Sequence, residues 1–272
     1  MIEPRPTNLP IALTIAGSDS GGGAGIQADL ATMAAHGVFG TSVLTAVTAQ
    51  NTIGVESTHV LPPEALTAQY EAVVSDFDVR AAKTGMLATA EIVQLVTARV
   101  AEAPFPVVVD PVMVAATGNR LLEREAERAT ETLVGEATVV TPNADEAAVL
   151  TGIDVVDEAT AREAGERLVA LGAEAALVKG GHVPGETVRD VLVTDTGAQT
   201  FTHPRVDTDA THGSGCSLSA AITARLARGD SIEDATERSV AFLATAIERH
   251  YDVGAGPGAV NPSAVSERGR RD

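Results

Sequence analysis

Short apolar runs alternate with longer helical patterns over almost the whole chain of 272 residues, and this alternation restricts the possible folds. The runs Val107–Val109 and Ala175–Val178 are continuously apolar, as expected for strands buried on both faces of a parallel sheet. Repeated strand–helix units favour a sheet with helices on both sides. We therefore predict an α/β fold, a three-layer α/β/α sandwich around a mainly parallel sheet of about eight strands.

The elements predicted by this pattern fill most of the chain. The strands are Ile11–Ala16, Ser42–Ala49, Arg80–Thr84, Val107–Asp110, Thr138–Thr141, Ala175–Lys179, Asp190–Thr194 and Gln199–Thr202. The helices are Ala24–His36, Glu64–Asp76, Thr89–Glu102, Leu121–Val134, Asn143–Leu150, Glu158–Leu171, Ser217–Arg228 and Ile232–His250. The turn residues Asp195-Thr196-Gly197 indicate a hairpin between the last two strands, so we expect a mixed sheet. We predict a single domain over residues 11–262, with an extension at 1–10 and a polar tail at 263–272.

Composition limits which residues can form the core and which partners the protein can bind. Aromatic residues make up 3% of the chain and tryptophan is absent, so Ala, Val, Leu and Ile must form the core. The formal net charge of −18 argues against nucleic acids and anionic membranes as partners. Because the acidic residues are spread along the chain, they indicate a solvated, self-repelling surface that would suit a halophilic cytoplasm.

The expected location is the cytoplasm. The single cysteine, Cys216, excludes an internal disulfide framework and fits a reducing compartment. The opening MIEPRPTNLP lacks the charged-then-apolar layout of a signal peptide. Since no apolar run reaches the ~18 residues of a membrane span, we expect no membrane partner.

The segment Ala210-Thr211-His212-Gly213-Ser214-Gly215-Cys216 precedes an apolar helical pattern and predicts an anion hole. A glycine-rich turn that opens a helix offers N–H groups and the positive end of the helix dipole to an anion. Gly213 and Gly215 lack the β-carbons that would block a phosphate. We expect Cys216, in the first helical turn, to have a lowered thiol pKa. The alternative is a helix-capping turn with an inert buried cysteine.

Polar residues at other strand ends suggest a ligand site. The glycine-rich turn after the first strand leads to Asp29, which could bond a polar heterocycle or be a surface carboxylate. Gln50 follows the second strand, and its amide suits a neutral nitrogen ring, although polar capping is the common alternative. In an open parallel sheet, ligands bind beyond the carboxyl ends of the strands.

Further strand ends carry residues suited to a nucleotide and its metal. Asp110 can hold Mg²⁺ directly or through water. Asn143 and Glu146 can support the same ion or form a helix N-cap and capping box, and both roles can hold together. Lys179, followed by two glycines, can place an ammonium on phosphates.

A set of motifs follows in fixed order along the chain: Ala12–Asp19, Gly22–Asp29, Thr45–Asn51, Lys83–Leu87, Asp110–Met113, Thr141–Asn143 with Glu146, Lys179–His182 and Thr211–Cys216. This ordered set resembles the hydroxymethylpyrimidine and phosphomethylpyrimidine kinases of thiamine biosynthesis, in the ribokinase-like superfamily. The resemblance covers residues 11–262. It implies a homodimer that uses ATP and Mg²⁺ to phosphorylate a hydroxymethylpyrimidine twice in one site.

The resemblance also implies roles for individual residues. The pyrimidine pocket is implied to contain Gly17, Asp29, Gln50, Met86 and Val112, with Asp29 and Gln50 bonding the ring and its amino group. Nucleotide contacts are implied for Lys179, Asn143, Thr211 and Gly213, and Mg²⁺ contacts, largely through water, for Asp110 and Glu146. The implied catalytic residues are Lys179, Gly213, Ser214, Gly215 and Cys216. Cys216 stands where many ribokinase-like enzymes have an aspartate base; whether it is a base or polarises the hydroxyl stays open.

Two departures and two alternatives accompany this resemblance. Thr48 occupies a pocket position that is often apolar in the family, and Gly254–Pro262 loosely matches a glycine-rich loop that would cover the adenine. One alternative is a pyridoxal or pyridoxine kinase of the same fold; Met86 and Gln50 favour the pyrimidine. The other is a non-catalytic pyrimidine sensor, which would not need the phosphoryl-transfer set of Lys179, Asp110 and Cys216.

Overall fold

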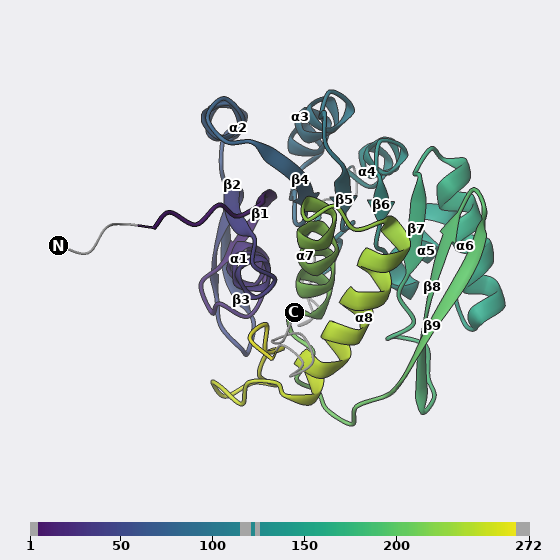
Figure 1. Ribbon diagram of the computed structural model, residues 1–272. Helices are drawn as coiled ribbons and strands as arrows, with labels where there is room; N and C mark the ends of the chain where they lie inside the picture. Colours follow the sequence, from purple (N-terminus) through teal and green to yellow (C-terminus); the bar gives the residue numbers. More distant parts are fainter. Residues whose placement is uncertain (1–4, 115–120, 123–125, 265–272) are drawn as a thin grey trace.

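The computed structural model describes residues 5–114, 121–122 and 126–264. Within them, one sheet of nine strands has the order β3-β2-β1-β4-β5-β6-β7-β8-β9 (Figure 1). The strands are β1 (Ile11–Asp19), β2 (Phe39–Gln50), β3 (Val55–Val60), β4 (Val79–Thr84), β5 (Val107–Val109), β6 (Val139–Val140), β7 (Ala175–Val178), β8 (Thr187–Thr194) and β9 (Gly197–Pro204). Strands β2, β1, β4, β5, β6 and β7 run parallel, whereas the pairs β2–β3, β7–β8 and β8–β9 are antiparallel. The sheet is therefore mixed, as predicted.

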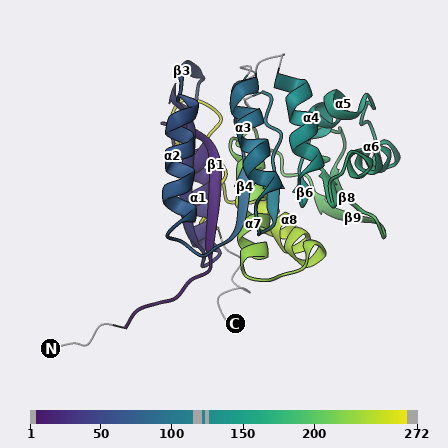
Figure 2. The same ribbon diagram turned by 90° about the horizontal axis from the view of Figure 1, so that it is seen from above.

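Helices cover both faces of the sheet (Figure 2). They are α1 (Gly25–Ala35), α2 (Pro63–Val74), α3 (Ala90–Ala101), α4 (Glu127–Gly135), α5 (Ala144–Thr151), α6 (Glu158–Ala170), α7 (Ser214–Ala227) and α8 (Ile232–Glu248). Helices α1, α7 and α8 lie on one face, and α2 to α6 lie on the other. None of the helices in the described ranges is long and apolar enough to cross a membrane.

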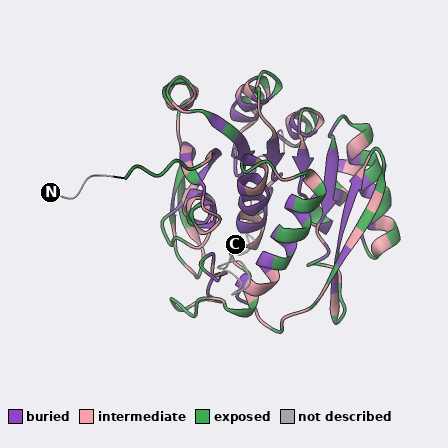
Figure 3. Ribbon diagram, in the orientation of Figure 1, coloured by how far each residue is buried: buried purple, intermediate pink, exposed green. Residues whose placement is uncertain are grey.

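The core consists of small and branched aliphatic side chains, as the composition predicts. Val108 and Val139 of the sheet pack against Leu218 and Ile222 of α7. A larger cluster fills the other layer, where the sheet meets α3 and α6. Buried residues accordingly concentrate in the sheet and on the inner helix faces (Figure 3). Burial of both sheet faces explains why the runs that became β5 and β7 are apolar without alternation.

One strand was not predicted, two helices start at other residues than predicted, and strands β1, β2, β8 and β9 extend beyond their predicted bounds. The ninth strand is β3, an edge strand whose residues are mostly exposed, so it lacks the apolar pattern used to find strands. Helix α4 starts at Glu127, later than the predicted Leu121, and the N–H groups of Leu121 and Leu122 bond to the Met113 carbonyl. Helix α7 starts three residues earlier than predicted, at Ser214. Residues 1–4 of the predicted extension and 265–272 of the predicted tail lie outside the described residues.

Candidate active site

A cavity of about 1180 Å³ opens where the parallel strands end. Loops after β1, β4, β5, β6 and β7 contribute to its wall, together with the first turn of α7. All but one of the residues predicted for the site line this cavity. They are Gly17, Gln50, Met86, Asp110, Val112, Asn143, Glu146, Lys179, Thr211, Gly213, Ser214, Gly215 and Cys216. The exception is Asp29.

The first turn of α7 forms one wall. Gly213 has a left-handed backbone (φ 80°), and a β-carbon there would overlap the carbonyl oxygen of Gly23. The helix begins at Ser214, so the N–H groups of Gly215 and Cys216 lie in its first turn, have no intrahelical partner and can donate to an anion. A β-carbon on Gly215 would lie 3.4 Å from Lys179 Nζ and 3.6 Å from Asp110 Oδ2. The glycines thus bring the helix start close to a cation and a carboxylate.

The Lys179 ammonium lies close to two carboxylates at this wall. Its Nζ lies 3.3 Å from Asp110 Oδ1 and 3.8 Å from Glu146 Oε2. Burial raises the pKa of Glu146, although the Lys179 ammonium opposes that shift. Burial also disfavours the charged form of Lys179, but Asp110 and Glu146 outweigh it and raise the Lys179 pKa. The lysine is therefore held as a cation facing the cavity.

Asn143 and Glu146 form the capping box of α5. The Asn143 N–H donates to Glu146 Oε2 at 2.8 Å, and the Glu146 N–H donates to Asn143 Oδ1 at 2.9 Å. This confirms the capping alternative without removing either side chain from the cavity wall. Two carboxylates, Asp110 and Glu146, beside an open cavity fit a magnesium ion that takes its other ligands from phosphates and water.

Asp19 and His212 were missed by the sequence reasoning. Asp19 accepts the N–H groups of Gly21, Gly23 and Ala24 at 2.8, 3.1 and 2.9 Å, and His212 Nε2 lies 3.0 Å from Asp19 Oδ2. Burial alone would raise the Asp19 pKa, but these hydrogen bonds hold it below its ordinary value. A carboxylate two residues before a glycine cluster was the available signal, since it can cap several nearby N–H groups.

The opposite end of the cavity also has unpredicted residues. Asp190 Oδ1 accepts the Gly180 N–H at 2.8 Å, and Asp190 Oδ2 lies 3.6 Å from His203 Nε2, which raises the His203 pKa. Arg205 donates to the carbonyls of Gly181, Val183 and Gly185, and so fixes the loop after Lys179. These contacts join β8 and β9 to the lysine loop, and no short motif could reveal them.

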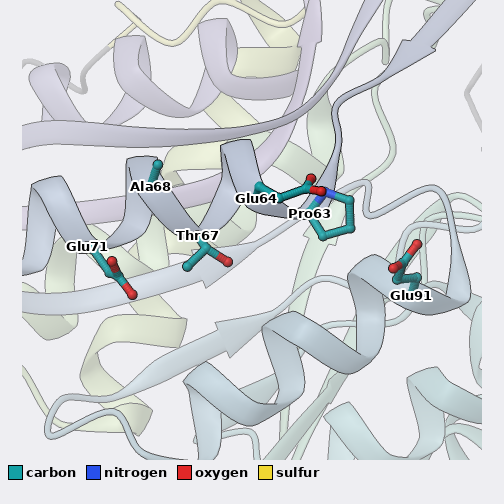
Figure 4. A pocket seen from close by; sticks show the side chains of 6 residues that line it. All are labelled: Pro63, Glu64, Thr67, Ala68, Glu71 and Glu91. Atoms are coloured by element: carbon teal, nitrogen blue, oxygen red, sulfur yellow. The ribbon is translucent and has the colours of Figure 1, made fainter.

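A second, shallow depression lies on helices α2 and α3 (Figure 4). Its lining residues are Pro63, Glu64, Thr67, Ala68, Glu71 and Glu91. Among the described residues, no group of three or more His, Cys, Asp or Glu is arranged to hold a metal. The depression shares no residue with the cavity at the strand ends.

The family model described as phosphomethylpyrimidine kinase matches residues 19–261. The chain belongs to the phosphomethylpyrimidine kinase family. It is 47% identical over 257 residues to the hydroxymethylpyrimidine/phosphomethylpyrimidine kinase of Streptomyces coelicolor, covering 94% of this chain and 95% of the relative. The ADP complex of Bacillus subtilis pyridoxal kinase is similar with a TM-score of 0.88 at 36% identity, covering 94% and 98% of the two chains. The phosphomethylpyrimidine kinase structure from Clostridium difficile gives a TM-score of 0.78 at 40% identity, covering 87% and 99%.

In this kinase, Asp29 does not take the position expected of it. Its carboxylate is fully buried, 2.7 Å from the Lys83 ammonium, and accepts the Thr14 hydroxyl at 2.6 Å. Helix α1 turns Asp29 toward β4 instead of toward the cavity or the solvent. The alternative of a surface carboxylate is therefore wrong, and the predicted contact with a heterocycle stays a prediction that this buried position does not favour.

The cysteine of the kinase faces the cavity, but its predicted ionisation is wrong. Burial raises the pKa of the Cys216 thiol to about 12, although Lys83 and the Gly25 N–H oppose this shift. Asp29 and Asp110 add negative charge nearby and raise the pKa further. Desolvation thus outweighs the helix N-terminus, and Cys216 is a neutral thiol at pH 7.

The C-terminal glycine-rich segment of the kinase does not line the cavity. It packs instead on the hairpin between β2 and β3, where the Gly256 N–H donates to Thr52 Oγ1 at 3.0 Å. The Val260 N–H donates to the His212 carbonyl at 3.1 Å. The interpretation of Gly254–Pro262 as a cover for the adenine stays a prediction, which this packing does not support. The segment braces the loop that precedes α7.

Proposed function

We propose that the protein transfers the γ-phosphoryl group of ATP to the hydroxymethyl oxygen of 4-amino-5-hydroxymethyl-2-methylpyrimidine, and then phosphorylates the monophosphate to the diphosphate. The observation that carries the proposal is the joint opening of an anion hole, a buried lysine and the Gln50 amide into one cavity. The printed names of the relatives support the same pair of reactions.

One set of residues in the cavity binds the nucleotide, and another set binds the pyrimidine. Lys179 neutralises phosphate charge, and the N–H groups at the start of α7 hold the transferred phosphoryl oxygens. Asp110 and Glu146 would hold Mg²⁺, largely through water, and that ion supplies further charge neutralisation across the phosphates. Asn143 and Thr211 contribute to the nucleotide side of the cavity.

The acceptor lies between Gln50 and Met86, with Gly17 and Val112 completing its pocket. A β-carbon at Gly17 would come 2.5 Å from the Met86 methyl group, so the glycine leaves room for that side chain. Gln50 bonds the polar edge of the ring. These contacts hold the hydroxymethyl oxygen toward the start of α7, where effective concentration lowers the barrier.

Cys216 polarises the hydroxyl group as a neutral thiol. A pKa of about 12 leaves almost no thiolate at pH 7 to act as a base. A loose phosphoryl-transfer transition state demands little of a base. The bond between the γ-phosphorus and the ADP oxygen breaks as the new oxygen–phosphorus bond forms, and the hydroxyl proton passes to a phosphoryl oxygen or to water.

Mass spectrometry of the products tests this function. Purified protein is incubated with Mg-ATP and the hydroxymethylpyrimidine in low and high salt, with pyridoxal in a parallel reaction. We expect mono- and diphosphorylated pyrimidine. Phosphorylated pyridoxal alone would favour the pyridoxal kinase alternative, which the similarity to solved pyridoxal kinases supports. Binding without ATP consumption would favour the sensor.

We also propose a cytoplasmic homodimer. The net charge of −18 and the single cysteine fit a reducing, salt-rich interior. The hairpin between β2 and β3 exposes Val47 and Ile53, of which Ile53 is 70% exposed, beside an open sheet edge. An apolar edge of this kind can be covered by a second copy of the chain. Light scattering in high salt would measure the mass and test the dimer.

A further inference from the structure

His212 lies where three segments of the cavity wall meet. Its Nε2 is 3.0 Å from Asp19 Oδ2 and 3.5 Å from the Gln50 amide nitrogen. Its ring fills the space beside Gly23, where a β-carbon would come within 2.5 Å of the ring. Its carbonyl oxygen accepts the Val260 N–H. The side chain is only 14% exposed, so its position is set by packing as well as by hydrogen bonds.

The hydrogen-bonding capacities of Asp19 and His212 determine which of their atoms donates. Asp19 is held ionised, since its pKa lies below its ordinary value, and a carboxylate only accepts hydrogen bonds. His212 Nε2 must therefore carry a proton to face Asp19 Oδ2 at 3.0 Å. A protonated ring nitrogen cannot accept a hydrogen bond from the Gln50 amide nitrogen beside it.

The oxygen of the Gln50 amide also faces an unsuitable partner, a hydroxyl group whose proton is already used. Thr48 Oγ1 lies 3.4 Å from Gln50 Oε1, but it also lies 2.8 Å from the Ser18 carbonyl oxygen. A hydroxyl has one proton, and the shorter contact to Ser18 uses it. Thr48 Oγ1 can then only accept. Turning the amide by 180° removes both mismatches. Its nitrogen can then donate to Thr48 Oγ1, and its oxygen faces His212 Nε2–H, which bonds mainly to Asp19 at 3.0 Å and reaches Gln50 at 3.5 Å as the weaker branch of a three-centre hydrogen bond.

We infer that His212 is a positioning residue that fixes the Gln50 amide in the orientation that recognises an aminopyrimidine. This inference rests on the proposed function and deepens it. With one amide lone pair directed to His212 and one N–H directed to Thr48, one N–H and one lone pair remain for the cavity. The 4-aminopyrimidine edge offers the complementary pair, a ring-nitrogen acceptor next to an amino donor. An unfixed amide could turn and present these groups in the wrong order.

The test measures the preference for the amino group. The preference is the kcat/KM ratio of 4-amino-5-hydroxymethyl-2-methylpyrimidine to the same compound without its amino group. In His212→Met we expect the preference to fall about three- to tenfold, the size expected for neutral hydrogen bonds, with the KM for ATP unchanged. His212→Gln, whose amide nitrogen can replace Nε2–H, should restore most of it. His203→Met, a matched change at the other end of the cavity, should leave the preference unchanged.

A double-mutant cycle separates orientation from general damage to the site. If His212 acts through Gln50, His212→Met causes no further loss of preference in a Gln50→Ala background. An unchanged preference in His212→Met, or an equal loss in both backgrounds, would overturn the inference. If His212→Met fails to fold by circular dichroism, Asp19→Asn replaces it. That side chain can donate, which frees His212 from its donor role, and the preference should fall; an unchanged preference would overturn the inference.

The proposed function and this inference fail in different ways. A wild-type protein that phosphorylates neither pyrimidine overturns the proposed function and the inference with it. A wild-type protein that phosphorylates the aminopyrimidine, with variants that keep its preference, overturns only the role of His212.

Discussion

Removal of the Asp29 carboxylate should damage stability more than substrate binding. Asp29 and Lys83 are both 0% exposed and 2.7 Å apart, and in Asp29→Asn the buried Lys83 ammonium loses its nearest counter-charge and keeps only the weaker attraction of Asp110. At an effective dielectric of about 20, the lost attraction is about 6 kcal/mol. The variant can also relieve the buried charge by losing the Lys83 proton. At pH 7 and from an ordinary pKa of 10.5, this deprotonation costs about 5 kcal/mol, which is the upper limit of the expected loss of stability. We expect a loss of about 3–5 kcal/mol in the free energy of unfolding.

Urea unfolding followed by circular dichroism measures this loss, with salt and pH held constant. The double variant Asp29→Leu/Lys83→Met replaces the pair by apolar groups and should regain most of the stability. Asp78→Asn is a matched control, because Asp78 is 81% exposed and its contact with Arg80 is a surface pair; little change is expected. Near-normal stability of Asp29→Asn together with a raised KM for the pyrimidine would refute this reasoning and restore a direct ring contact.

Three further predictions concern the cavity. Alkylation of Cys216 by iodoacetamide should be slow at pH 7 and still rise above pH 9, because burial raises the thiol pKa to about 12; a plateau below pH 8 would contradict the neutral thiol. Lys179→Met should lower kcat by at least about 100-fold and raise the KM for ATP, because it removes charge neutralisation at the phosphates, and steady-state kinetics with unchanged constants would rule out that role. Asp19 has a pKa below its ordinary 3.8, so it contributes stability above pH 3.8 that is lost as the pH falls through the depressed value. Asp19→Asn should therefore flatten the acid limb of a stability–pH curve measured by urea unfolding; an unchanged limb would count against the shift.

The layered fold and the place of the cavity at the strand ends followed from the sequence because their signals are local. Buried parallel strands need continuous apolar runs, which marked β5 and β7, and the glycines before an apolar helical pattern marked the start of α7 to within three residues. Strand β3 was missed because its position at the sheet edge leaves its side chains in solvent. No periodic pattern is then required of them.

The errors at the site arose where distant residues decide the chemistry. Asp29 follows a glycine loop, but its partner Lys83 is supplied by another strand, so the turn alone could not show that the carboxylate is buried. For Cys216, the helix start was visible, whereas the desolvation that dominates its pKa depends on the whole assembled wall. His212 and Asp19 are similarly joined only by folding.

The place of α7 in the chain has a consequence for synthesis on the ribosome. This helix packs on β1, β4 and β5, yet it follows β5 by about a hundred residues. At about 5–20 residues per second, the apolar side of these strands waits roughly 5–20 seconds for its cover. During that interval a nascent chain exposes an apolar surface that can associate with other nascent chains. Like charges spread along the emerging polypeptide keep such chains apart, so the acidity of the sequence protects the protein before it has folded.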